Sequence, residues 1–315
     1  MILSASRRTD IPNYYADWFY NRLNEGFLLV RNPMNAHQIS RISLSPSVVD
    51  GIVFWTKNPA GMLGRLEELR AYPYYVQFTL TGYGRDVEPG LPDKRTVLIP
   101  AFRELAEKAG AGRVVWRYDP IFISDRYTAA YHRKAFAEIA AALAGYTRRV
   151  VVSFLDCYVK TRRNTAALRI SHDSEKEAFA LAGELAATAR RHGMETMSCA
   201  EPYDLQDMGI KPGSCIDKAL LETVTGCRLA GGKDKNQRAA CGCMESVDVG
   251  NYHTCLTGCR YCYANHSIEA ARENAKAYDP HSALLCGRIG PDDRVTERKV
   301  KSLKDMQTAV NFAMD

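Results

Sequence analysis

The chain has 315 residues, of which 46% are hydrophobic and 25% charged, and its formal net charge is +6. This composition is typical of a folded protein with a large core and excludes a largely disordered chain. No apolar run approaches the ~20 residues that cross a bilayer, and Met1–Ser6 lacks the apolar stretch of a signal peptide. The sequence therefore predicts a cytoplasmic protein that has no membrane partner.

The positive charge is mild and dispersed. Paired arginines occur at four separate places rather than in one dense tract: Arg7-Arg8, Arg148-Arg149, Arg162-Arg163 and Arg190-Arg191. Such a distribution permits an anionic partner, nucleic acid included, without indicating one.

Short β-rich runs alternate with longer helical patterns along the chain. The expected strands are Ile2–Ser6, Gly51–Thr56, Tyr74–Leu80, Arg113–Tyr118, Arg149–Leu155, Glu195–Cys199 and, more weakly, Ser246–Val249. The expected helices between them are Tyr14–Glu25, Gly61–Ala71, Arg95–Ala109, Ala129–Ala144 and Glu175–His192. This alternation predicts a parallel α/β sheet, and the number of strands favours a TIM-like barrel over an open sheet.

Two regions depart from this alternation. Phe27–Arg31 and Ile39–Leu44 flank turn residues and predict a side hairpin, so the eighth barrel strand is either this piece or missing. After Cys199, glycine, lysine and cysteine increase, and further helices are expected at Ser267–Tyr278 and Val300–Phe312. We expect residues 1–200 to form the main part of the barrel, and residues 201–315 to form a cysteine-rich portion that closes it.

Most of the ten cysteines fall between Cys199 and Cys262, which indicates metal binding rather than disulfides in a reducing compartment. Cys255, Cys259 and Cys262 have the spacing C-x3-C-x2-C. Three thiolates in one loop suit an iron–sulfur cube and leave one iron for another ligand. A structural zinc site is the alternative, although zinc motifs more often use paired C-x2-C units.

Tyr261 precedes the third cysteine, and the whole motif resembles the C-x3-C-x-aromatic-C signature of the radical S-adenosylmethionine (SAM) superfamily. The resemblance implies a 4Fe-4S cluster whose open iron binds the amino and carboxylate groups of SAM, with Tyr261 against the adenine. The reduced cluster would pass one electron to the sulfonium, giving methionine and a 5′-deoxyadenosyl radical that abstracts hydrogen. It also implies an electron donor such as flavodoxin or ferredoxin, but the substrate remains unknown.

Nearly the whole chain is also similar to an uncharacterised prokaryotic family known only as a domain of unknown function. The similarity is carried by Ser4–Pro12, Phe54–Pro59, Arg117–Pro120 and the cysteine-rich end. The Trp55–Asn58 piece is faintly similar to enzymes near spore photoproduct lyase.

The motif lies about four fifths of the way along the chain, whereas in most radical SAM proteins it follows the first barrel strand. We therefore expect a permuted barrel in which Ser246–Val249 precedes the cluster loop and lies against Ile2–Ser6. The glycine-rich SAM-binding motif that usually follows the second strand has no clear counterpart here.

Four further cysteines, Cys199, Cys215, Cys241 and Cys243, could together hold a second iron–sulfur cluster or a zinc ion. The alternative is that Cys199 and Cys215 are small buried hydrophobic residues. Three isolated cysteines are interpreted as structural: Cys157, Cys227 and Cys286.

Barrel active sites form where strands end, so polar residues at those positions are catalytic candidates. From Arg7, Arg8, Asp10, Lys57, Asn58, Asp119, Asp156 and Glu201, we select Arg7, Asp10, Lys57, Asp119 and Glu201. The segment that precedes Cys241 contains three side chains that could contact a cofactor carboxylate or phosphate: Lys235, Gln237 and Arg238. The alternatives are ion-paired or solvated strand ends and an ordinary loop surface.

The sequence thus predicts a radical SAM-type enzyme of unknown substrate. Two other classes stay open. One is an iron–sulfur or zinc protein that binds nucleic acid without catalysis, which strongly salt-dependent binding would favour. The other is an electron carrier, in which four protein ligands would complete the cluster and SAM would not bind.

Overall fold

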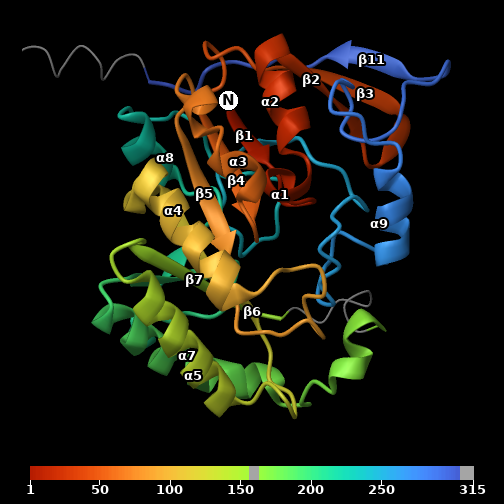
Figure 1. Cartoon of the computed structure of the whole chain (residues 1–315). Helices are drawn as coiled ribbons and strands as arrows, with labels where there is room; N and C mark the ends of the chain where they lie inside the picture. Colours follow the sequence, from red (N-terminus) through yellow and green to blue (C-terminus); the bar gives the residue numbers. More distant parts are fainter. Residues whose placement is uncertain (156–162, 306–315) are drawn as a thin grey trace, which may run out of the picture.

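The structure is a computed structural model that describes residues 1–155 and 163–305 (Figure 1). Asp156, Cys157 and the second half of the helix expected at Val300–Phe312 lie outside these residues. The described beginning of that segment, residues 300–305, is not helical, so the expected start of this last helix is wrong.

A parallel eight-stranded sheet forms the centre of the fold. In spatial order its strands are β10 (Val247–Asp248), β1 (Ile2–Ala5), β4 (Gly51–Thr56), β5 (Tyr74–Thr79), β6 (Val114–Ile121), β7 (Arg149–Phe154), β8 (Glu195–Cys199) and β9 (Ile210–Gly213). The α/β class with a parallel sheet is therefore confirmed.

The expected closure into a barrel is not observed, because β9 and β10 remain the two edges of an open sheet. The reason lies in the length and composition of these two strands. β10 has only two residues, and β9 has four that include Pro212 and Gly213. Proline lacks the N–H that a further strand would need, and glycine weakens a strand, so neither edge offers a continuous ladder.

Strand β10 pairs in parallel with β1, with Leu3 opposite Val247 and Ser4 opposite Asp248. This confirms the expectation that the segment before the cysteine loop lies beside the first strand of the chain. The Asp248 carboxylate accepts hydrogen bonds from Ser4 Oγ at 2.8 Å and Ser6 Oγ at 2.6 Å. Two segments that are far apart in the sequence are thus joined at the carboxyl end of β1.

Helices cover the outer face of the sheet (Figure 1). They are α1 (Ile11–Tyr14), α2 (Ala16–Glu25), α3 (Ala60–Leu63), α4 (Ile99–Ala109), α5 (Ala129–Leu143) and α7 (Ser174–Arg191), with shorter turns η1 (Leu66–Leu69), η2 (Lys94–Leu98), η3 (Ala111–Arg113), η4 (Ala166–Leu168) and η5 (Gln206–Met208). Phe102 of α4, Phe136 of α5 and Leu185 of α7 belong to the main buried core. Alternate strand residues such as Phe78 and Trp116 complete this core, as the two-residue period of a strand requires.

The opposite face of the sheet packs against the cysteine-rich part of the chain. Val53 and Tyr75 share a second core with Leu220 and Leu221 of helix α8 (Lys218–Thr225). Helix α9 (Ile268–Ala275) follows the cysteine loop and lies at the side of the molecule (Figure 1). The expected helix at Ser267–Tyr278 is thus confirmed in a shorter form.

A small second sheet contains β11 (Arg294–Glu297), β3 (Asn35–Ser43) and β2 (Phe27–Asn32) in that order. Strands β2 and β3 are antiparallel, which confirms the side hairpin. The hairpin is therefore not the eighth strand of the main sheet, a place taken by β9.

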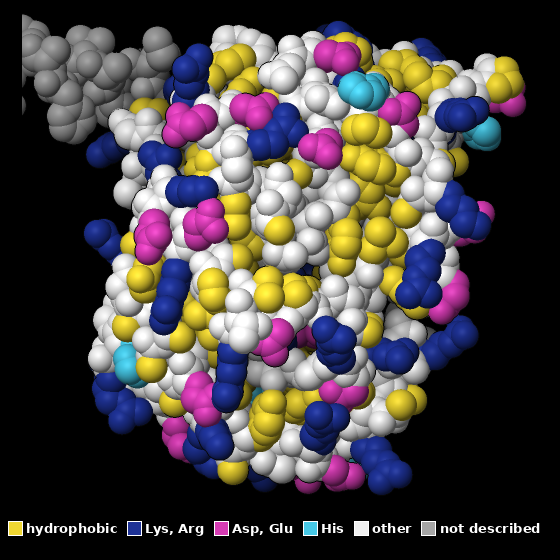
Figure 2. Space-filling model, in the orientation of Figure 1, with side chains coloured by type: hydrophobic (Ala, Val, Ile, Leu, Met, Phe, Trp, Pro, Cys, Tyr) yellow, Lys and Arg dark blue, Asp and Glu magenta, His cyan; other side chains and the backbone are white. Residues whose placement is uncertain are grey.

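Lysine and arginine side chains are interspersed with aspartate and glutamate over the face shown in Figure 2, and hydrophobic side chains lie between them. On this face the positive charge is not gathered into one patch. Among the helices of the described residues, none combines the length and apolar character needed to span a membrane.

Candidate functional site

A cavity of about 820 Å³ lies at the carboxyl ends of several strands of the main sheet. Most of the site residues expected from the sequence line it: Arg7, Asp10, Lys57, Asp119, Gln237, Arg238, Tyr261, Cys199, Cys215, Cys241, Cys243, Cys255, Cys259 and Cys262. The two cysteine sets therefore face one space. Its size is that of a pocket for a cofactor and a small substrate.

Two expected site residues lie apart from this lining. Glu201 Oε1 accepts a hydrogen bond from the backbone N–H of Phe154 at 3.0 Å, so this carboxylate fixes the end of β7. Lys235 is exposed on a turn. Glu201 is nevertheless adjacent in sequence to Ala200, which lines the cavity together with Cys199.

The loop of residues 255–262, which we call the cysteine loop, is held in place by backbone hydrogen bonds to the segment after β5. Gly90 N–H donates to Thr257 O at 3.0 Å, and Arg260 N–H donates to Val87 O at 2.9 Å. A Cβ atom on Gly90 would lie 2.7 Å from Thr257 O, so only glycine permits this approach. Gly258 has a φ of +69°, a left-handed conformation that lets the loop curl between two cysteines.

The three thiols of the cysteine loop act on one another through charge. Burial raises the pKa of Cys255 to about 11, with further contributions from Asp10 and Cys262. Burial also raises the pKa of Cys259, although the positive charge of Lys57 acts in the opposite direction. A metal that binds here must displace protons from these thiols, which is the usual linkage between metal binding and pH.

A buried ionic network lies directly beside the cysteine loop. Lys57 Nζ donates to Glu88 Oε1 at 2.8 Å and to the Tyr261 hydroxyl at 2.7 Å. The Tyr261 hydroxyl and Lys94 also donate to Glu88. Burial alone would raise the pKa of Glu88, but the two lysines lower it far below its usual range. The network fixes the Tyr261 ring and keeps a positive charge near Cys259.

Asp10 caps helix α1 and also faces the cavity. Its carboxylate accepts from Thr56 Oγ1 at 2.7 Å, from Lys57 N at 2.8 Å and from Asn13 N at 3.1 Å. Burial raises the pKa of Asp10 to about 6 despite these bonds. A carboxyl group with such a pKa can exchange a proton near neutral pH.

The second cysteine set, Cys199, Cys215, Cys241 and Cys243, comes from three segments. Cys199 ends β8, Cys215 lies just beyond β9, and the other two precede β10. The sulfurs of Cys199 and Cys215 are 3.0 Å apart. Cys215 and Cys241 both raise the pKa of Cys243, whose sulfur accepts from Ile216 N at 3.4 Å. The four cysteines line the same cavity, and the sulfurs of Cys199 and Cys215 are in contact.

Arg117 is the buried cation of the second set. Its Nη1 donates to Cys215 Sγ at 3.1 Å, and its Nε donates to Asp119 Oδ1 at 3.0 Å. Burial works to lower the pKa of Arg117, but Asp119, Cys215 and Cys199 raise it well above its usual value. The hydrogen bonds from Cys199 and Cys243 lower the pKa of Cys215, whereas the pKa of Cys199 is raised. Cys215 is therefore the more readily ionised thiol of the Cys199–Cys215 pair.

Arg7 lies between the two cysteine sets. Its guanidinium is 3.8 Å from Asp248 and lies over the Trp55 ring at 5.9 Å. Burial works to lower its pKa, yet Asp248 and the cysteines of the second set raise it. Its carbonyl oxygen accepts from the Tyr263 hydroxyl of the cysteine-loop side at 2.8 Å.

Within residues 1–155 and 163–305, no group of three or more histidine, cysteine, aspartate or glutamate side chains already has an arrangement that could hold a metal ion. Cys227 and Cys286, expected to be structural, are partly buried and pack against the two main hydrophobic cores. They provide matched controls for substitutions in both sets.

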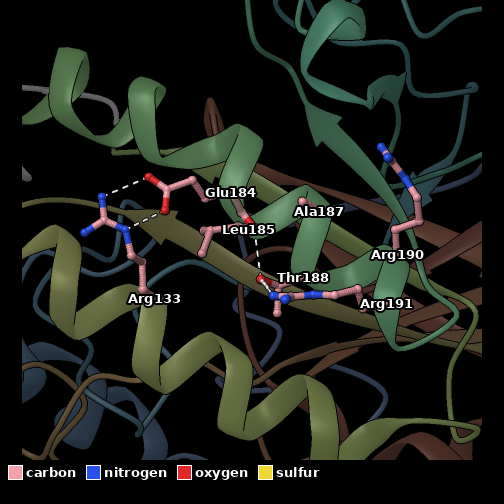
Figure 3. A pocket seen from close by; sticks show the side chains of 7 residues that line it. All are labelled: Arg133, Glu184, Leu185, Ala187, Thr188, Arg190 and Arg191. Atoms are coloured by element: carbon pink, nitrogen blue, oxygen red, sulfur yellow. Dashed lines mark hydrogen bonds and ion pairs between the residues drawn. The ribbon is translucent and has the colours of Figure 1, made fainter.

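A second depression of about 740 Å³ lies between α5 and α7 and contains none of the expected site residues. Figure 3 shows that Arg133 and Glu184 point toward each other across it, with contacts of 2.7 and 2.9 Å, and that Arg191 turns toward Thr188. Its polar side chains are therefore engaged in surface pairs at some distance from the cysteines.

Four residues of the site were not expected from the sequence. Arg117 lies on β6, Glu88 and Lys94 belong to the segment after β5, and Asp248 belongs to the shortest strand. The signal for Glu88 was its place in a glycine-rich stretch after a strand, Thr81–Gly90, where a barrel-like fold places binding loops.

The chain was compared with protein families and with curated proteins. The family model described as a domain of unknown function, DUF1848, matches residues 2–264, so the chain belongs to this family. No curated protein matches the chain.

Proposed function

We propose that this DUF1848 chain is a radical SAM-type iron–sulfur enzyme in which Cys255, Cys259 and Cys262 hold a 4Fe-4S cluster with one iron open to SAM. The observation that carries the proposal is the position of the cysteine loop. It follows β10, and β10 pairs with β1, so the three thiols reach the carboxyl ends of a parallel sheet. A fold of this type places its chemistry at that edge.

The residues present fit the group in number and chemistry. Three thiols from one loop supply three of the usual four cluster ligands, and the cavity leaves room for a further ligand. When bound and reduced, such a cluster would supply one electron for the reductive cleavage of SAM to methionine and a 5′-deoxyadenosyl radical.

The protein's own side chains would position the reactants and exclude water. Lys57 holds a positive charge near Cys259, which favours a negatively charged cofactor at the loop. Hydrogen bonds from Lys57 and to Glu88 set the orientation of Tyr261 before any ligand arrives. Arg7, Asp10 and the Arg117–Asp119 pair line the remaining wall and would orient a polar substrate or move a proton at the Asp10 carboxyl.

The test is the iron content and SAM turnover of protein purified and reconstituted without oxygen. We expect about four iron atoms per chain and slow release of 5′-deoxyadenosine after reduction with dithionite, even without substrate. Cys259→Ala should lose both the iron and the product, whereas Cys227→Ala should keep both. Iron without 5′-deoxyadenosine would favour an electron carrier instead, and failure to take up iron at the cysteine loop would contradict the proposal.

A further inference from the structure

We propose that Cys199, Cys215, Cys241 and Cys243 form a tetrathiolate zinc site that joins the two open edges of the main sheet. This inference does not rest on the proposed function, because it concerns the second cysteine set alone. It assigns a structural metal to the part of the cavity wall that these four cysteines form.

The spacing of the sulfurs favours a single metal ion over a cluster. Two thiolates on one tetrahedral zinc, each at ~2.3 Å from the metal, lie about 3.8 Å from each other. The sulfurs of Cys199 and Cys215 are 3.0 Å apart, and Cys241 and Cys243 line the same cavity, with Cys243 Sγ 3.4 Å from the backbone N of Ile216, the residue after Cys215. A zinc ion therefore requires the first pair to separate by about 0.8 Å, a side-chain rotation. A cube of iron and sulfide would need a much larger expansion.

The position of the four cysteines supplies a reason for the site. β9 and β10 are the edges that strand pairing leaves unjoined. Cys215 follows β9, while Cys241 and Cys243 precede β10, so one metal would span the gap. The backbone already approaches there, because Met244 N–H, before β10, donates to Ile216 O, after β9, at 3.0 Å.

The surroundings of the four sulfurs are those of a supported metal site. Tyr75 Oη and Gln77 Nε2 both donate to Cys215 O, at 2.6 and 2.9 Å, and fix the backbone of that ligand. Arg117 donates to its sulfur at 3.1 Å. Four thiolates on one divalent ion retain roughly two negative charges, and the guanidinium groups of Arg117 and Arg7, each also paired with an aspartate, lie close enough to act on these cysteines.

The experiment measures metals in the full-length protein. We expect about one zinc per chain, and zinc-edge X-ray absorption should show four sulfurs at ~2.3 Å. Cys243→Ser should lower zinc content at least tenfold and leave the iron of the cysteine loop in place. Cys227→Ser is the control and should change neither metal. Arg117→Gln should weaken zinc affinity roughly tenfold, the typical effect of losing a group that hydrogen-bonds a ligand.

The two proposals fail separately. A Cys255→Ala/Cys259→Ala/Cys262→Ala variant should lose iron and keep zinc. Iron and sulfide retained by this triple variant would overturn the zinc assignment in favour of a second cluster. A wild-type protein without zinc whose mass and thiol count show a Cys199–Cys215 disulfide would also overturn it. Because the absorption measurement uses the wild-type chain, the proposal stays testable even if Cys243→Ser does not fold.

Discussion

The two cysteine sets face the same cavity but are assembled in different ways. The cysteine loop gathers three thiols within residues 255–262, and neighbouring segments only support it. The second set depends on β8, on the end of β9 and on the segment before β10, which become neighbours only when the sheet has formed. Under the two proposals above, the first set would therefore bind metal as a local unit, whereas the second would bind only in the folded chain.

Removal of zinc tests this difference most strongly and should have the largest effect on stability. A ligand that binds only the folded state at about 1,000 times its dissociation constant adds about 4 kcal/mol. For a chain of this size we expect chelation to lower the melting temperature by about 6 °C. Thermal unfolding of the protein with and without a zinc chelator measures the change.

Iron removal provides the comparison. A loop whose three ligands are close in sequence can also bind metal when unfolded, and this reduces the net stabilisation. We expect the iron-free Cys255→Ala/Cys259→Ala/Cys262→Ala variant to melt less than half as far below the wild type as the chelated protein does. Equal shifts for both metals would contradict the distinction between a local and a distributed site.

The same distinction explains what the sequence could predict. The cysteine loop was found from spacing alone, and its place beside β1 followed from requiring a strand before it. Strands Gly51–Thr56 and Glu195–Cys199 were predicted with their observed bounds. The first is a nearly continuous run of apolar and β-branched residues, the pattern of a buried strand. Local patterns were sufficient wherever the feature itself was local.

The errors concern features that depend on distant contacts. β9 was missed because Pro212 and Gly213 are poor strand residues, and only the neighbouring β8 holds it in the sheet. A closed barrel was expected from the number of strands. That number does not reveal that the two edge strands, β9 and β10, are too short to pair with each other. Glu88 was missed because its role depends on Lys57, which follows β4, as well as on Lys94 of its own segment. Glu201 lies one residue beyond the lining and binds backbone instead.

Lys57→Gln should cause the next largest loss of stability, and this loss should affect the region around the cysteine loop and not the second cysteine set. The Glu88 side chain is only 1% exposed, and the substitution removes one of its two cations. Glu88 keeps Lys94 as a partner, so the loss of one charged hydrogen bond should destabilise the protein by about 2 kcal/mol. Urea unfolding of the variant measures the loss. Adding Glu88→Gln should recover part of it, and zinc content should not change. Additive losses in the double variant would show that the pair is not coupled.

Acid should separate the two regions through His132. Burial lowers its pKa to about 4, whereas an unfolded histidine titrates near 6.5. The unfolded state therefore binds more protons between these values, so stability should fall by about 2 kcal/mol as pH falls from 7 to 5. His132→Gln should remove this dependence, and the exposed His172→Gln should not. The His132 ring packs on Tyr83, which contacts Tyr261, so hydrogen exchange at pH 5 should rise first beneath the cysteine loop.

The smallest expected effect distinguishes the two roles of Tyr261. Tyr261→Phe removes the hydroxyl that binds Glu88 and Lys57 but keeps the ring. It should cost about 1 kcal/mol of stability and leave iron content and SAM affinity unchanged. Tyr261→Ala removes the ring as well and should weaken SAM binding roughly tenfold, since an aromatic ring supplies packing rather than ligation. Isothermal titration with SAM and iron analysis of both variants measure these outcomes, with Tyr263→Phe as the control. If Tyr261→Ala also loses its iron, the ring holds the cysteine loop in place instead of contacting the ligand.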